Sequence, residues 1–169
     1  QYSCVSHNQA VNYTGGYVKY FAYGSNMSLV RLQERVPSAE LLSVCKLKEH
    51  QLRFHKGSKD GSGKCDTFKT DNEFDAVIGA LFEINHDEKP ALDKAEGLTY
   101  GYAEKLVTVI NNTGDECEAL TYYATKVDDT LKPYSWYLNH VVIGASEIEV
   151  PVQYLEMLKA TESIDDPDK

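Results

Sequence analysis

Residues 17–26 of this chain read YVKYFAYGSN, and the character of the sequence changes within this stretch. β-Branched and aromatic residues fill positions 17–23, which is typical of a strand. Gly, Ser and Asn at 24–26 interrupt that pattern, and apolar residues then recur at helical spacing over 29–36 until Pro37 ends them. The stretch therefore predicts a strand, a short turn and a helix in direct succession.

Further elements follow from the same kinds of signal along the rest of the chain. An Asn-rich turn at 111–115 separates two apolar segments and predicts a hairpin. Many non-local strands with a few interspersed helices favour an α+β fold in the form of a small mixed β-barrel. The expected elements are a long strand over 41–54, a loop over 57–64, a buried strand over 77–84, a helix over 87–95, hairpin strands over 106–110 and 119–123, and helices over 134–145 and 152–161.

Length and composition limit the class of protein. With 169 residues, 42% of them hydrophobic and 25% charged, the chain fits one globular domain around one core. We expect that domain over 17–162, between a flexible N-terminal extension at 1–16 and a frayed acidic tail at 163–169. No apolar run is long enough for a membrane-spanning helix. Seventeen basic against 26 acidic residues give a net charge of -9 without a basic cluster, so neither nucleic acid nor a membrane is expected as a partner.

Cysteines and glycosylation sequons bear on the compartment. The four cysteines form no C-x-x-C pair, so a zinc site is not expected, and either up to two disulfides or four reduced thiols fit the spacing. Three N-x-[ST] sequons, in a chain that begins at Gln1 without a signal-like segment, favour a secreted, extracellular glycoprotein, with a cytoplasmic protein as the alternative. The cysteines are Cys4, Cys45, Cys65 and Cys117, and the sequon asparagines are Asn12, Asn26 and Asn111.

The turn at 24–26 is the first candidate for chemistry. Because the first N–H groups of a helix lack partners and carry partial positive charge, a Gly-Ser turn in front of a helix suits a carboxylate or an oxyanion. The plainer interpretation is an ordinary turn in which Asn26 or Ser28 caps the helix.

Glu96 is the second candidate. It lies at the end of the helix expected over 87–95, where the negative end of the helix dipole disfavours a carboxylate, and partial burial would raise its pKa further. That is the direction a general acid or base needs. The alternative is an exposed helical glutamate, as most glutamates are.

Tyrosine is unusually frequent, with 12 Tyr against 5 Phe. Convergent phenols can hydrogen-bond a polar substrate, or they can simply pack across strands. Eight of the twelve fall in four short segments that flank or follow the candidate elements: Tyr20, Tyr23, Tyr100, Tyr102, Tyr122, Tyr123, Tyr134 and Tyr137.

Several common catalytic signatures are missing from the sequence. It contains no G-x-S-x-G elbow, P-loop or G-x-G-x-x-G motif. Its five histidines show no H-x-x-x-H spacing, which argues against a metal site. The spacing does not exclude a Cys–His nucleophile, but no feature of the sequence supports one.

Four segments between residues 18 and 162 form a pattern that is more specific than any one of them. They read YFAYGSN at 20–26, LDKAEG at 92–97, PYSWY at 133–137 with GA at 144–145, and PVQYLEMLKA at 151–160. In this order and spacing they resemble the γ-glutamylcyclotransferase family, whose fold is a mixed β-barrel with flanking helices. Asn after Tyr-Gly-Ser is similar to the branch that acts on γ-glutamyl amino acids, whereas the glutathione-specific branch usually has an apolar residue there.

The resemblance implies a reaction and a set of site residues. In the family, the α-amine of a γ-glutamyl compound attacks its own γ-carbonyl and releases 5-oxoproline and an amino acid, without a cofactor. By position, Glu96 would move the proton from the attacking amine to the leaving nitrogen. Backbone N–H groups of Gly24, Ser25 and Asn26 would hold the γ-glutamyl group. The tyrosines implied to bind this small-molecule substrate are Tyr23, Tyr102, Tyr122 and Tyr137.

Two features depart from the family pattern. After Gly101 the family often has an aromatic pair or an aromatic residue two positions on, whereas here Ala103 follows Tyr102. The extension at 1–16 and the expected secretion are also unlike the usual cytosolic enzyme. Two alternatives therefore stay open, a glutathione-specific cyclotransferase and a secreted, non-catalytic binding protein on the same fold. We also expect that the chain can form a homodimer, and that the sequon at Asn26 is unused because a glycan there would block the pocket.

Overall fold

Five strands close into a barrel in the computed structural model, which describes residues 16–169. They follow the order β1–β5–β2–β6–β7, and the neighbours β1–β5, β5–β2, β2–β6 and β6–β7 are antiparallel. β1 and β7 close the barrel in parallel, with Tyr20 opposite Leu120. The expected α+β fold with a small mixed β-barrel is therefore confirmed. The strands are β1 (Tyr17–Ala22), β2 (Glu40–Lys48), β5 (Ala76–Asn85), β6 (Tyr102–Asn111) and β7 (Glu116–Ala124).

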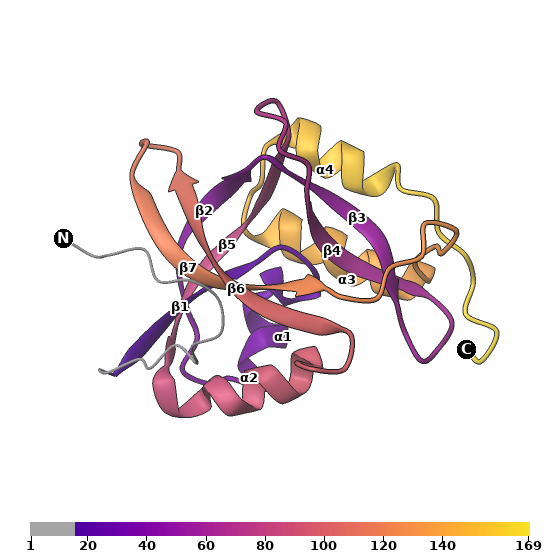
Figure 1. The fold of residues 1–169 in the computed structure, drawn as a ribbon, viewed down its shortest axis with the longest axis horizontal. Coiled ribbons are helices and arrows are strands. Elements are labelled where there is room, and N and C mark those ends of the chain that lie inside the picture. The colour runs from indigo at the N-terminus through magenta and orange to yellow at the C-terminus, as the bar shows by residue number, and fades with distance from the viewer. Residues whose placement is uncertain (1–15) are drawn as a thin grey trace.

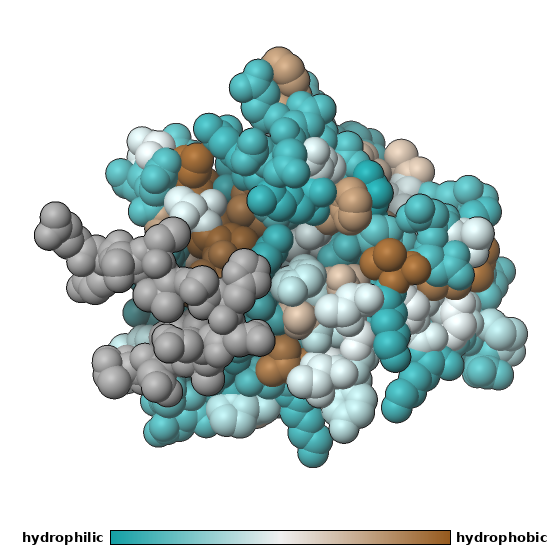
Figure 2. All heavy atoms as spheres, in the orientation of Figure 1, coloured by the Kyte–Doolittle hydropathy of each residue, from teal (hydrophilic) through white to brown (hydrophobic). Residues whose placement is uncertain are grey.

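Large apolar side chains on both faces of the barrel strands are buried. Phe21, Phe82, Ile84, Val109 and Leu120 are at most 1% exposed, and they come from four of the five strands. Burial of such side chains is the main favourable term in folding. On the outside, Figure 2 shows hydrophilic side chains over most of the visible face, with apolar ones in small groups.

Residues 41–54 form two strands rather than the single long strand expected from their sequence. β2 ends at Lys48, Glu49 adopts a left-handed φ of 62°, and β3 (His50–Gly57) begins in another sheet. The Glu49 N–H donates to the Asp75 carbonyl at 2.8 Å, which holds the bend. β3 pairs with β4 (Gly63–Lys69), a strand that the sequence did not predict, in a separate antiparallel two-stranded sheet.

The helices lie where the sequence predicts them, with small differences at their ends. In Figure 1, α3 and α4 lie together on the side of β3 and β4, whereas α1 and α2 lie below the barrel. Short 3-10 turns precede both α1 and α2. The helical elements are η1 (Ser25–Met27), α1 (Leu29–Gln33), η2 (His86–Glu88), α2 (Lys89–Glu96), α3 (Ser135–Glu147) and α4 (Val152–Lys159).

The ends of α2 carry residue types that commonly begin and end helices. Pro90 lies in its first turn, and Gly97 ends it with a left-handed φ of 72°. Asn85 caps the 3-10 turn η2 that precedes α2, because its side-chain oxygen accepts the Asp87 N–H at 2.9 Å, whereas the N-cap residue of α2 itself, Glu88, makes no side-chain capping bond. Together these caps place Glu96 at the last position of α2.

The acidic tail packs against α3 instead of fraying. Ile164 pairs with Tyr134 in an isolated bridge, and the indole N–H of Trp136 donates to Asp166 at 2.9 Å. Lys169 Nζ lies 4.0 Å from the centroid of the Trp136 ring. An indole donor that needs an acceptor thus orders a segment whose composition alone suggests disorder.

The three cysteines within residues 16–169 are free thiols, so of the two alternatives left open by the sequence, disulfides or reduced thiols, this part of the chain has reduced thiols. They lie on separate strands: Cys45 is opposite Gly79 and Asn111, and Cys117 is opposite Val109. Residues 1–15 lie outside the described residues. They include Cys4, the Asn12 sequon and all of the expected N-terminal extension except residue 16. Within residues 16–169, no helix has the length and apolarity to cross a membrane, and His, Cys, Asp and Glu form no cluster suited to a metal ion.

Candidate active site

The turn after β1 carries the first candidate residues. The Gly24 carbonyl accepts the Met27 N–H at 3.1 Å, and the chain continues through η1 into α1. Ser28 is the N-cap of α1 but its side chain makes no capping bond, and the Asn26 side chain bonds other groups. The interpretation of this turn as a side-chain helix cap is therefore wrong.

Helix α3 supports the turn from behind through a glycine. A Cβ atom added to Gly144 would lie 2.7 Å from the Ser28 nitrogen and 3.0 Å from Met27 Cβ, closer than side chains normally pack. Glycine at this position lets the helix touch the backbone of the turn.

Asn26 joins the turn to the end of α2. Its side-chain Nδ2 donates to Glu96 Oε1 and, at 3.4 Å, to the hydroxyl of Tyr20. Asn26 is only 5% exposed. Two candidates that lie 70 residues apart in the sequence are thus in direct contact.

The Glu96 carboxyl has the acidity that its position in the sequence suggests. Burial raises the pKa of Glu96 to about 7, although the positive charges of Arg35, Arg31 and Lys56 and the hydrogen bond from Asn26 act in the opposite direction. A carboxyl with that pKa can both accept and donate a proton near neutral pH. The raised pKa agrees with the expectation from sequence, but the three neighbouring cations were not foreseen.

The hydroxyl groups of the candidate tyrosines are held by protein partners. Tyr23 donates to the Tyr122 carbonyl at 2.6 Å, and Tyr102 donates to the Cys65 carbonyl at 2.5 Å. The Tyr122 hydroxyl donates to Asp93 Oδ1 at 2.6 Å. The Tyr137 hydroxyl differs, because it accepts the Cys65 N–H at 3.1 Å and keeps its own proton.

These phenols remain protonated at neutral pH. Burial is the main cause that raises the pKa of Tyr23, Tyr102 and Tyr137 well above the ordinary value, and it also raises the pKa of Tyr122. Three of the hydroxyls therefore offer only lone pairs to a ligand, while Tyr137 offers a proton.

All eight residues singled out from the sequence line one small cavity of about 30 Å³, here called the inner cavity. A second, more open space of about 220 Å³, the outer cavity, shares five of its lining residues with the first. Together they fall below the range of about 300–1,000 Å³ typical of ligand pockets, so the site suits a small ligand. The inner cavity is lined by Tyr20, Tyr23, Gly24, Ser25, Asn26, Cys65, Glu96, Tyr102, Tyr122 and Tyr137.

Three residues of the inner site were not proposed from the sequence. Tyr20 lies in the opening stretch and was counted only among the clustered tyrosines. Cys65 lies on β4, the strand that was not predicted, and burial raises the pKa of its thiol to about 12, so it gives no support to a Cys–His nucleophile. Asp93 holds the Tyr122 hydroxyl and also binds Lys89 Nζ at 2.5 Å.

Comparison with known proteins places this site in a family. The model of the AIG2-like family matches residues 76–158. A gamma-glutamylcyclotransferase from Bos taurus is 32% identical over 151 residues, which cover 86% of this chain and 79% of the relative. The gamma-glutamylcyclotransferase from Homo sapiens is also 32% identical, over 154 residues, with the same coverage.

Solved structures agree with the sequence relatives. A gamma-glutamyl cyclotransferase structure has a TM-score of 0.84 and 30% identity, with 90% of this chain and 92% of that chain covered. A gamma-glutamyl cyclotransferase specific to glutathione from yeast shares the fold at a TM-score of 0.65 and 11% identity, with 85% and 94% of the two chains covered. The chain therefore belongs to the gamma-glutamylcyclotransferase family.

Proposed function

We propose that the protein is an enzyme that converts γ-glutamyl amino acids to 5-oxoproline and a free amino acid. The observation that carries this proposal is the Glu96 carboxyl, with a pKa of about 7, in contact with Asn26 inside a cavity lined by tyrosines. Membership of a family whose relatives bear the name gamma-glutamylcyclotransferase supports the same activity.

The inner cavity suits the reacting end of such a substrate. The hydroxyls of Tyr23, Tyr102 and Tyr122 donate their hydrogen bonds to protein oxygens. Their lone pairs can therefore accept hydrogen bonds from the N–H groups of an α-amine. Tyr137 keeps a proton for a substrate oxygen. An amine beside a carboxylate, as in a γ-glutamyl group, matches this division into acceptors and a donor.

Ring closure forms one C–N bond and breaks another. The substrate's α-nitrogen attacks its γ-carbonyl carbon, and ionised Glu96 takes a proton from that nitrogen. Protonated Glu96 then gives the proton to the leaving nitrogen as the amide bond breaks, so no water is consumed and no cofactor is needed.

Two further effects assist this step. Gly24, Ser25 and Asn26 line the cavity, and backbone N–H groups of this turn would be suited to stabilise the negative charge that develops on the γ-carbonyl oxygen. A small cavity also favours a folded glutamyl chain, and holding the amine close to the carbonyl is a large part of the rate enhancement in an intramolecular reaction.

The direct test is to incubate the purified protein with γ-glutamyl-alanine and to quantify 5-oxoproline. Wild type is expected to form it, and Glu96→Gln is expected to lose about 10²–10⁴-fold in kcat because the proton carrier is gone. Glu147→Gln is the matched control, since Glu147 is an exposed glutamate at the end of α3. Equal rates for Glu96→Gln and wild type would refute the role of Glu96.

The same assay separates the alternatives. Faster turnover of glutathione than of γ-glutamyl-alanine would identify a glutathione-specific enzyme. Retention of a γ-glutamyl ligand without any product would identify a binding protein. The sequence relatives and the structure at 30% identity favour neither alternative, because their names specify gamma-glutamylcyclotransferase without glutathione specificity.

An extracellular location with glycosylation is a separate proposal. It is supported by the Asn111 sequon, which lies at the start of an exposed hairpin turn between β6 and β7. The Asn26 sequon lies in the buried site, so we expect a glycan on Asn111 and none on Asn26. Peptide mass mapping of the natural protein tests both expectations, and light scattering of the purified chain tests the homodimer, which also stays a proposal.

A further inference from the structure

The outer cavity is lined by an unusual set of charges. Of the described residues that line it, four are cationic and one, Glu96, is acidic. The chain as a whole carries a net charge of -9, so this concentration of cations runs against the overall balance. The four cations are Arg31, Arg35, Lys56 and Lys64.

Two of these cations face each other across the small sheet. Lys56 on β3 is directly opposite Lys64 on β4, and both side chains line the outer cavity. Like charges directly opposite on neighbouring strands are destabilising. Burial, together with the repulsion from Lys64, lowers the pKa of Lys56. An anion between the two ammonium groups would remove this penalty.

Each lysine is also aimed at a tyrosine of the inner cavity. Lys56 Nζ lies 4.8 Å from the centroid of the Tyr102 ring, and Lys64 Nζ lies 4.2 Å from that of Tyr137. The lysines are only partly exposed, and the Lys64 side chain is 17% exposed. The ammonium groups therefore border the reacting site and do not extend into bulk solvent.

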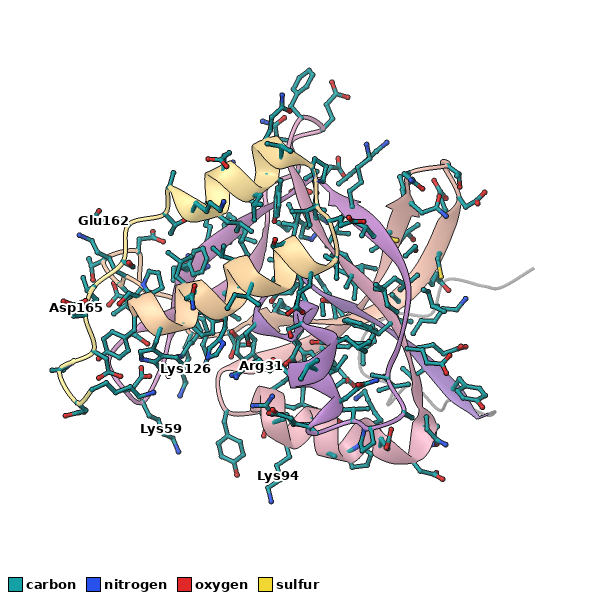
Figure 3. All side chains as sticks on the ribbon, turned by 180° about the vertical axis from the view of Figure 1, so that it is seen from behind. Arg31, Lys59, Lys94, Lys126, Glu162 and Asp165 are labelled. Carbon is teal, nitrogen blue, oxygen red and sulfur yellow. The ribbon has the colours of Figure 1, made fainter. Side chains whose placement is uncertain are left out.

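The positive charge is poorly compensated by the protein. Lys64 Nζ lies 3.4 Å from Asp60, but among residues 16–169 no ion pair involves Arg31, Arg35 or Lys56. The Nε atom of Arg31 is buried and has no hydrogen-bond partner within the described chain. Figure 3 labels Arg31 beside α1, below α3, where it lines the outer cavity.

We propose that the outer cavity binds the leaving amino acid and selects one whose side chain ends in a carboxylate, so that γ-glutamyl-glutamate and γ-glutamyl-aspartate are preferred substrates. This inference rests on the proposed function. The leaving nitrogen must lie beside Glu96, which both cavities share, so the rest of the leaving group extends into the outer cavity.

The four cations can be divided between two carboxylates. Arg35 and Arg31 act on Glu96 more strongly than Lys56 does, so they suit the carboxylate nearest the leaving nitrogen. A substrate such as γ-glutamyl-alanine then has no second carboxylate for the opposed pair, in which Lys64 has Asp60 at 3.4 Å and Lys56 has no ion pair among the described residues. A second carboxylate on the leaving side chain supplies one.

The test compares γ-glutamyl-glutamate with γ-glutamyl-glutamine, which has nearly the same shape without the charge. Wild type is expected to turn over the acidic peptide with a kcat/KM about tenfold higher, as one charge-assisted contact allows. The preference is expected to shrink as salt is raised. In Lys56→Met and in Lys64→Met, which keep the length of the apolar stem, the ratio is expected to fall toward one.

Lys59→Met is the control, because Lys59 is an exposed lysine of the loop between β3 and β4 that does not line the cavity, and Figure 3 shows its side chain extending away from Arg31. It is expected to keep the wild-type ratio. Turnover of both peptides at equal or reversed efficiency overturns the inference and leaves the proposed function intact. If neither these peptides nor γ-glutamyl-alanine are converted, the proposed function is wrong. Calorimetric titration of the wild type with the same two peptides then still decides whether the outer cavity prefers the acidic one.

Discussion

The inner and outer cavities share Glu96 but are built in opposite ways. In the inner cavity the hydroxyls of Tyr23, Tyr102 and Tyr122 each donate to a fixed protein acceptor. In the outer cavity the lining cations include Lys56, which has no ion pair within the described chain. In the proposed reaction the two halves of the substrate are therefore held by different means, the reacting half by fixed hydrogen bonds and the leaving half by charge.

The hydrogen bonds that fix the side chains of the inner cavity continue into residues behind its lining. Asp93, which accepts the Tyr122 proton, is bound by Lys89, and Lys89 Nζ lies 2.7 Å from Glu104. A phenol fixed in this way keeps one orientation before the substrate arrives, which is the preorganisation that catalysis requires. Of the outer lysines, Lys64 pairs with Asp60, which Ser62 holds, whereas Lys56 has no ion pair among residues 16–169, so the position of Lys56 can follow the leaving group.

Asn26→Asp is expected to have the largest effect on the inner cavity. It places a second carboxyl against Glu96, and two carboxyls in contact cannot both ionise near neutral pH. We expect kcat for γ-glutamyl-alanine to fall about 100-fold, within the range for losing one acid–base group. Asn112→Asp, in the exposed hairpin turn, is the control and should behave as wild type. Full activity in Asn26→Asp would contradict the proposed geometry.

Gly144→Ala tests whether the inner site depends on rigid support. The added Cβ would lie 2.7 Å from the Ser28 nitrogen, so either α3 or the turn must move. Such overpacking costs about 1–3 kcal/mol in the free energy of unfolding. Urea denaturation should show that loss, and kcat should fall by more than it does in the exposed control Ser146→Ala. Unchanged stability and activity would mean that the turn can move without cost, and this would contradict the dependence of the inner site on rigid support.

Lys56→Met is expected to have the smallest effect, and it shows how a residue of the outer cavity acts on the inner one. Lys56 lowers the pKa of Glu96, so its removal should raise that pKa further. The acidic side of the pH–kcat/KM profile for γ-glutamyl-alanine should therefore move to higher pH, while the rate at high pH changes little. Lys59→Met should leave the profile in place, and a shift to lower pH would contradict the assigned sign.

Local sequence patterns predict much of the inner site. β1, the turn at 24–26 and the capped helix α2 each follow from residue types within a few positions, and they bring Asn26 and Glu96 to the barrel end. The convergence of Tyr102, Tyr122 and Tyr137 needed the family resemblance, because barrel closure rather than local pattern brings their strands and helix together.

The outer site could not be predicted in the same way. Its lysines face each other only because the chain bends at Glu49 and forms β3 and β4, and no glycine marks that left-handed position. A strand register also depends on partners that are distant in sequence. In the sequence, Lys56 and Lys64 therefore cannot be distinguished from ordinary surface lysines. The order of the tail, which depends on Trp136, was hidden for a similar reason.

The pH dependence of kcat/KM for γ-glutamyl-alanine tests whether buried Glu96 is the proton carrier. Because the reaction needs ionised Glu96 in the free enzyme, kcat/KM should rise with pH along a limb whose midpoint is about 7. That limb should be absent from the residual activity of Glu96→Gln. A midpoint near the ordinary value of 4.5, or the same limb in Glu96→Gln, would contradict the claim.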